Sequence, residues 1–337
     1  MEFLRRRLGL ILRTLVSALA ICYVVRTNNW SKVWENVLTM DVVWLVVAIL
    51  CFIPTLVVVA WRWRMLLAVH GIHLRFWRIF ELNMIGQFFS TVGVGTTGGD
   101  IFKIFYVARA VPQKKAAVSF TVILDRVIGL VALLIFGALL SFANLPLFFS
   151  NHHTKVLTCT FYFFALGGIV ALLFGSLSPF VLRHKGFQAL LKRLPLIHRA
   201  TSLFDALETS ARAVGVNLVA LVGSIPSHMC IIAMGYFILQ AMHLNPNLLA
   251  FCAIMAIVNM LIALPVSISG VGVREALFIT FLALIGIDQA HAVAFSLIYF
   301  CLTILWCLMG APFYFLYRHE THAPAPDTTQ VEPIFTK

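Results

Sequence analysis

Charged residues are scarce in this chain of 337 residues: Asp, Glu, Lys and Arg make up only 11% of it, and 13 residues are acidic. Soluble domains contain about 25% charged and about 45–50% apolar residues, whereas 61% of this sequence is hydrophobic. No stretch is polar enough to form a soluble domain, which excludes most cytosolic enzymes. Continuous apolar runs of about 20 residues indicate a polytopic helical membrane protein and argue against a transmembrane β-barrel.

Several chemical signatures are also missing. The sequence has no Cys-x-x-Cys pair, no His-Glu-x-x-His zinc motif, no nucleophile-elbow motif and no Walker loop. Its seven cysteines all lie in apolar segments, which is typical of small buried side chains. We therefore predict no catalytic residue, no metal site and no cofactor.

The apolar runs predict an all-α fold with about six full spans and two weaker segments. A net charge of +12 would suggest nucleic acid for a soluble protein, but here the basic residues flank apolar runs. They therefore indicate topology and contact with anionic lipid headgroups, and no nucleic-acid partner. The full spans are expected at about 8–25, 42–61, 117–141, 156–177, 214–241 and 290–316. The weaker segments lie at 79–97 and 248–287.

Basic residues predict the orientation of the chain. Four basic groups and the two last basic residues together hold 20 of the 25 Lys and Arg, and positive charge is typical of cytoplasmic loops. The groups lie at 5–13, 62–78, 103–115 and 183–212. If all are cytoplasmic, 79–97 must enter and leave from the cytoplasm, and 248–287 must do so from outside. We expect a bacterial-type cytoplasmic (inner) membrane, with both termini cytoplasmic.

Segment order further predicts an inverted repeat inside one membrane domain, 1–318. Residues 1–141 and 155–317 each contain two spans, a re-entrant helical hairpin and a further span, so the second half begins on the opposite side. The breaks at Gly99 and Gly270 occupy corresponding places in the two halves. Transporters with this architecture bind substrate near the midplane, where broken helices meet. Residues 319–337 are expected to be a short disordered cytoplasmic tail.

The two breaks contain glycines, hydroxyl groups and charges. Glycine permits close approach of backbone to a ligand, and helix N-termini attract anions. Asp100 is expected as the N-cap of the helix after the first break. One interpretation is a shared headgroup site, and the other is that the glycines only allow close helix packing. The candidate residues are Gly98, Gly99, Asp100 and Lys103 in the first break, and Ser267, Ser269, Gly270, Gly272, Arg274 and Glu275 in the second.

Four more polar residues lie at membrane depth: Glu81, Gln87, Asp125 and Arg126. Charged side chains there are costly unless they are paired or hydrated. In one interpretation Arg126 contacts an anionic substrate and Asp125 tunes it or carries a proton. In the other the charges form structural contacts, such as Asp125 with Lys103 or Arg126 with Asp100, and Glu81 and Gln87 make polar contacts in the core. We expect the whole polar set to line one cavity that opens sideways to lipid. Trp61, Trp63 and Trp77 are expected to be anchors at the membrane interface.

The residues from Pro265 to Glu275 resemble the P-x-S-x-G-G-x-G-x-R-E signature of the lysylphosphatidylglycerol synthase transmembrane-region family, with Ser269 replacing one glycine. Gly98-Gly99-Asp100 resembles its first-half motif without the usual preceding proline. Asp125-Arg126 resembles its Glu-Arg motif. The resemblance covers about 5–317 and implies a flippase-like membrane domain. In that family aminoacyl transfer belongs to an added soluble domain. We expect no such domain after His319, and therefore no enzyme.

These observations favour a flippase or transporter of an anionic lipid, either a phospholipid or a polyprenyl-phosphate-linked carrier, with a midplane headgroup site. One alternative is a membrane-embedded transferase that acts on a lipid phosphate. Another is a scaffold for lipid-synthesis partners. The predicted partners are the bilayer and the lipid substrate, while a homo-oligomer or a lipid-synthesis partner is left open.

Overall fold

The computed structural model describes residues 22, 24–92, 96–183, 201–263 and 272–320, which are helical without any β-strand in these ranges. Five helices or helix pairs in this part are long and apolar enough to cross a membrane. They span Val42–Val69, Pro112–Phe142, His152–Phe174, Val214–Ala241 and Gln289–Tyr317. The helical membrane fold predicted from the sequence is therefore confirmed. The expected span at 8–25 lies outside the described residues except for 22, 24 and 25, so a total of six stays a prediction.

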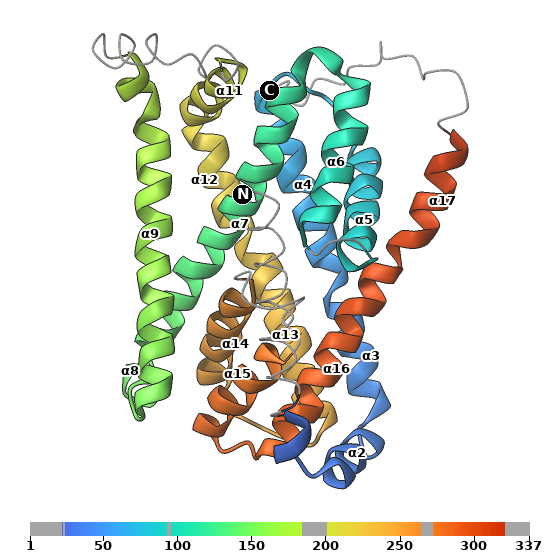
Figure 1. The fold of residues 1–337 in the computed structure, drawn as a ribbon, viewed down its shortest axis with the longest axis vertical. Helices are drawn as coiled ribbons and strands as arrows, with labels where there is room; N and C mark the ends of the chain where they lie inside the picture. The colour runs from blue at the N-terminus through green and yellow to red at the C-terminus, as the bar shows by residue number, and fades with distance from the viewer. Residues whose placement is uncertain (1–21, 23, 93–95, 184–200, 264–271, 321–337) are drawn as a thin grey trace, which may run out of the picture.

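Figure 1 shows the helices in their order along the chain. Those of the first half are α2 (Trp30–Leu38), α3 (Val42–Cys51), α4 (Ile53–Val69), α5 (Phe76–Val92), α6 (Thr96–Ala110) and α7 (Lys115–Phe142). Those that follow are α8 (Leu145–Phe148), α9 (His152–Arg183), α11 (Thr201–Arg212), α12 (Val214–Gly223), α13 (Ile225–Ala241), α14 (Leu248–Ala263), α15 (Val273–Leu282), α16 (Gln289–Leu308) and α17 (Gly310–Glu320). Short 3-10 turns precede α7 and follow α15.

Two spans are each interrupted by a proline at corresponding positions. Pro54 lies in the first turn of α4 and Pro226 in the first turn of α13. Proline is tolerated at a helix start but cannot continue the preceding helix, because it lacks an N–H. The two broken spans touch at these starts: the hydroxyl of Thr55 donates to the carbonyl of Ser227 at 3.3 Å. Thr55 and Ser227 are 172 positions apart in sequence, and the two prolines before them have the same separation.

Helices α5 and α6 form a helical hairpin whose backbones touch. A Cβ atom added to Gly99 would lie 2.0 Å from the carbonyl oxygen of Gly86, so no larger residue fits at this crossing. Both glycines are buried. In Figure 1 this hairpin occupies the upper half of the molecule, where its open ends meet α4 and α7. The two glycines thus determine how closely α6 approaches α5.

A second helix pair, α14 and α15, lies in the opposite half (Figure 1). The start of α5 at Phe76 and the start of α14 at Leu248 have the same separation in sequence as Thr55 and Ser227. The side chains of α14 are buried nearly all round, and they form the main core together with side chains of α13, α15 and α16. The sequence predicted one hairpin in each half, and the structure has helix pairs at both places.

A polar contact ties the end of α4 to α11 and to the turn before α7. The ring Nε2 of His70 lies 2.8 Å from the hydroxyl of Ser210, and the ammonium of Lys114 donates to the carbonyls of His70 and Gly71 at 2.9 Å each. Burial, and to a smaller extent the charge of Lys114, lower the pKa of His70 below its ordinary value. Protonation of His70 is therefore disfavoured in the folded protein.

Candidate functional site

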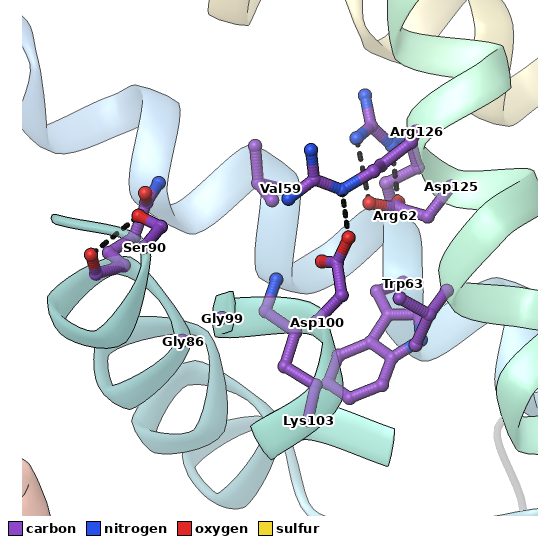
Figure 2. A pocket seen from close by; sticks show the side chains of 12 residues that line it. Val59, Arg62, Trp63, Gly86, Ser90, Gly99, Asp100, Lys103, Asp125 and Arg126 are labelled. Atoms are coloured by element: carbon purple, nitrogen blue, oxygen red, sulfur yellow. Dashed lines mark hydrogen bonds and ion pairs between the residues drawn. The ribbon is translucent and has the colours of Figure 1, made fainter. Parts of the chain in front are cut away.

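A cavity of about 270 Å³ lies between α4, α7 and the α5–α6 hairpin. Five charged side chains line it: Arg62, Asp100, Lys103, Asp125 and Arg126. Figure 2 shows them converging from three elements, with Asp100 and Lys103 rising from α6 toward the arginines. Three cations face two carboxylates, so this charged cavity has a net positive charge.

Arg62 and Asp125 form a buried, two-pronged ion pair. Nε of Arg62 lies 2.6 Å from one carboxylate oxygen and Nη2 lies 3.0 Å from the other, and the side chains are 6% and 9% exposed. The remaining nitrogen, Nη1, donates to the hydroxyl of Ser224 at 2.8 Å. One arginine thus joins α4, α7 and the break between α12 and α13. The prediction that Arg62 belongs to a cytoplasmic flank is wrong, because the apolar helix continues to Val69.

Small residues make room for this guanidinium. A Cβ atom at Gly129 would lie 2.9 Å from Nη1 of Arg62, so a larger residue here would force the guanidinium to shift. The carbonyl of Gly129 also lies 2.9 Å from Nε2 of His228 on α13. Gly129 therefore lies where three helices meet, one turn after Asp125.

Arg126 pairs with Asp100 across the mouth of the cavity (Figure 2). The Arg126 side chain is 48% exposed, whereas that of Asp100 is 15% exposed. The sequence analysis named this pair as one possible structural contact. The other contact named there, between Asp125 and Lys103, is not formed, because Asp125 pairs with Arg62. Asp100 does not start its helix as expected. Because α6 begins at Thr96, Asp100 lies one turn inside it.

Lys103 has no carboxylate of its own. Within the described part of the chain it makes no ion pair, and its ammonium lies 5.4 Å from the centroid of the Trp63 ring. The side chain of Lys103 packs against the buried Gly86. A Cβ atom added to Gly86 would lie 2.6 Å from Cε of Lys103. Trp63 is 1% exposed, so it is a cavity wall instead of the predicted interfacial anchor. Its indole N–H has no hydrogen-bond partner among the described residues.

The charged residues of the second break form a separate cluster, in which they pair with each other. Arg274 contacts Glu275, donates from Nε to the hydroxyl of Ser296 at 3.0 Å, and lies 4.1 Å above the ring centroid of Phe300. Glu275 accepts the N–H of Gly272 at 2.6 Å, which caps the start of α15. Both charged residues are buried, at 4% and 5% exposure. The other candidates of this break, Ser267, Ser269 and Gly270, lie outside the described residues.

The polar residues that were expected to line one cavity therefore lie in different places in the structure. Gln87, Gly99, Asp100, Lys103, Asp125 and Arg126 line the charged cavity. Glu81 instead pairs with Arg78 at 3.3 Å on a half-exposed surface. Gly98 precedes Gly99 in α6 but is not part of the lining. Sequence reasoning missed Arg62, Trp63 and Gly86 as lining residues. The apolar residues Met65 to Val69, which follow Arg62 and Arg64, were the available signal for the first two.

Comparison with known proteins gave one result. No curated protein and no solved structure matched the chain. A family model described as the lysylphosphatidylglycerol synthase TM region matches residues 10–310. That range includes the charged cavity and the Arg274–Glu275 cluster, and it covers most of the 337 residues. The chain is therefore a multi-pass membrane protein that belongs to the lysylphosphatidylglycerol synthase transmembrane-region family.

Proposed function

We propose that the protein moves an anionic lipid across the bilayer and that the charged cavity binds the lipid headgroup. The observation behind this proposal is the unbalanced charge of Lys103. Both carboxylates of the cavity already bind arginines, and Lys103 makes no ion pair in the described part of the chain. An unpaired cation at membrane depth is costly unless an anion joins it. A phosphate between Lys103 and Arg126 would supply that anion.

The exposure of Arg126 supports the same proposal. Its guanidinium lies at the cavity mouth, so an incoming phosphate can compete with Asp100 for it. Arginine binds phosphate through two parallel hydrogen bonds, which makes this exchange favourable. Pockets for drug-sized molecules begin at about 300 Å³, so a cavity of about 270 Å³ admits a headgroup but not a whole lipid. The hydrocarbon chains would remain outside the charged cavity.

We further propose an inverted repeat of residues 1–141 and 155–317, with both termini cytoplasmic in an inner membrane of bacterial type. The starts of α3, α4 and α5 precede those of α12, α13 and α14 by the same separation that Thr55 has from Ser227. The contact between Thr55 and Ser227 supports a pseudo-two-fold axis, because equivalent residues can touch only near such an axis. Transporters with inverted repeats bind substrate at the interface of the two repeats.

Lipid transfer by the purified protein tests this proposal. Proteoliposomes would contain a fluorescent anionic lipid, either labelled phosphatidylglycerol or a labelled polyprenyl phosphate, and an external reductant would report its arrival in the outer leaflet. We expect wild-type protein to accelerate transfer and Lys103→Gln to reduce it about tenfold or more, as for loss of a charged contact. Lys155→Gln is the matched control, because Lys155 is exposed at the start of α9. Equal transfer with and without wild-type protein would refute the proposal.

A further inference from the structure

A second cavity, of about 250 Å³, lies beside the charged one and is mainly apolar. We call it the axial chamber. Helices α4, α5, α7, α13, α14 and α16 and the junction between α3 and α4 provide its walls. The apolar lining comprises Phe52, Leu56, Leu133, Ile231, Ile232 and Cys307. No charged residue lines the axial chamber within the described part of the chain. An anionic headgroup would therefore find no counter-charge there.

The polar side chains of the axial chamber already have partners. Tyr299 donates to the amide oxygen of Asn259 at 2.9 Å, and the indole N–H of Trp306 donates to the carbonyl of Ile49 at 3.2 Å. His228 lies 2.9 Å from the carbonyl of Gly129. Water needs several free hydrogen-bonding groups to occupy an interior cavity, and apolar cavities stay dry. The chamber therefore suits hydrocarbon better than water or a polar group.

Gln87 connects the two cavities, because it lines both. A ligand with its phosphate in the charged cavity could thus extend past Gln87 into the axial chamber. Phe52 and Trp306 stack at 5.7 Å between ring centroids in the wall of the chamber, and both are only half-buried. This wall therefore borders the surface that faces lipid.

The axial chamber also lies at the proposed repeat axis. Two pairs of its lining residues have the sequence separation that relates the two repeats: Leu56 with His228, and Gln87 with Asn259. Equivalent residues face each other across a single cavity only when that cavity lies on the axis between the repeats. Repeat-based transporters place the substrate at this interface.

We propose that the axial chamber binds the headgroup-proximal segment of a single hydrocarbon chain, and that the substrate is a phosphate monoester with one chain, of the prenyl phosphate class. This inference rests on the proposed function, which places the phosphate beside Lys103. Protein interiors leave few voids larger than water, so an apolar cavity of this size is best explained by an apolar occupant. Its volume of about 250 Å³ is below that of pockets for whole drug-sized molecules, at about 300 Å³ and above, and suits one chain instead of two.

Chain-length dependence of binding tests the inference. The probes are inorganic phosphate, geranyl phosphate, farnesyl phosphate and the two-chain lipid dihexanoyl phosphatidate, each titrated onto the full-length protein in nanodiscs of zwitterionic lipid. Thr303→Phe fills the chamber from α16, and Cys307→Phe does so independently in case the first variant does not fold. Leu305→Phe adds similar bulk to the same helix at a position 42% exposed and outside the chamber, and is the matched control.

We expect wild type and Leu305→Phe to bind farnesyl phosphate at least about tenfold more tightly than inorganic phosphate, since each buried methylene adds affinity. Filling the chamber should remove that gain but leave inorganic phosphate binding unchanged. Lys103→Gln should weaken all probes. An unchanged gain in both filled variants, or tighter binding of dihexanoyl phosphatidate than of farnesyl phosphate, would overturn the inference. If wild type binds none of the phosphates, the proposed function itself fails.

Discussion

The guanidinium of Arg62 binds both carboxylate oxygens of Asp125, at 2.6 and 3.0 Å, and so fastens α4 to α7. These residues are 63 positions apart in sequence. The third contact of Arg62, to Ser224, adds the broken span of the second half. The pair forms the rear wall of the charged cavity, while Arg126, the next residue of α7, reaches the mouth. Adjacent charged residues thus have different environments because helical neighbours point about 100° apart.

Removal of the Asp125 charge should be strongly destabilising. Asp125→Asn leaves the buried Arg62 without its counter-charge, and breaking a buried pair in this way costs about 3–5 kcal/mol. The double variant Arg62→Met with Asp125→Leu should recover much of the loss, because no uncompensated charge remains. Thermal unfolding in detergent measures both. Glu208→Gln breaks an exposed pair with Arg212 and serves as the control, with a change of about 0.5 kcal/mol or less. Equal melting temperatures for Asp125→Asn and wild type would contradict the burial argument.

The glycine crossing of the α5–α6 hairpin gives a second prediction. Gly99→Ala places a methyl group 2.0 Å from the carbonyl of Gly86, so the helices must separate and stability should fall by several kcal/mol, the range of severe overpacking. Gly167→Ala on α9 meets nothing within 4 Å. It should stabilise its helix by about 0.5–1 kcal/mol, because alanine has the better helix propensity. Thermal unfolding of the two variants should give shifts of opposite sign.

Arginine-to-lysine variants should show that the two charged clusters have different roles, one in lipid transfer and one in stability. Arg126→Lys keeps the charge but loses the two-pronged phosphate contact, and should lower lipid transfer about tenfold at unchanged melting temperature. Arg274→Lys cannot keep the contacts to Ser296 and Glu275, and should lower the melting temperature clearly. Transfer is measured in proteoliposomes and stability in detergent. Full transfer by Arg126→Lys would mean that the lipid phosphate binds elsewhere.

The pH dependence of stability should include a contribution from His70. Its pKa is lowered in the folded protein, first by burial and then by Lys114, while the unfolded chain has a value of about 6.5. The unfolded state therefore takes up the proton more readily, and stability is lost as pH falls below about 6.5. Melting temperatures at pH 7.5 and 5.5 should show a larger decrease for wild type than for His70→Gln. Equal decreases would show that His70 does not contribute.

Membrane orientation is tested by labelling introduced thiols with an impermeant maleimide in intact cells, with wild-type labelling subtracted. Pro112→Cys, in the turn before α7, should be protected, and Asp288→Cys, at the N-cap of α16, should be labelled. The basic residues at both ends of 79–97 motivate the first result, and the parity of the spans the second. The opposite pattern at either site would refute the inverted repeat.

The helical membrane fold was predictable, because hydropathy is a local signal. The pairing of charges was only partly predictable. Arg126 with Asp100 was among the expected contacts, but Arg62 with Asp125 was not, because Arg62 stands next to Arg64 and resembles a flanking charge in sequence. Its burial depends on Gly129 and Ser224, which lie on other helices. Such contacts are set by tertiary packing and have no local signature.

The second break shows the opposite difficulty, because its charged residues were predicted to bind a ligand. Arg274 and Glu275 have the composition of a binding site, yet Glu275 caps α15 through the N–H of Gly272 and pairs with Arg274. Residue types and spacing are the same for a cap and for a ligand site. Only the positions of Ser296 and Phe300, on a helix later in the chain, distinguish the two.

The contact between Gly86 and Gly99 has a mechanical consequence. With backbone against backbone, α5 cannot slide along α6 without a collision, so we expect the two helices to move together. Asp100 and Lys103 lie on α6, and Gln87 lies on α5. Any displacement that pulls the two charged side chains toward a phosphate must therefore shift Gln87 at the same moment. If the charged cavity binds a lipid headgroup as proposed, we expect the opening beside Gln87 into the axial chamber to change in width when the headgroup binds.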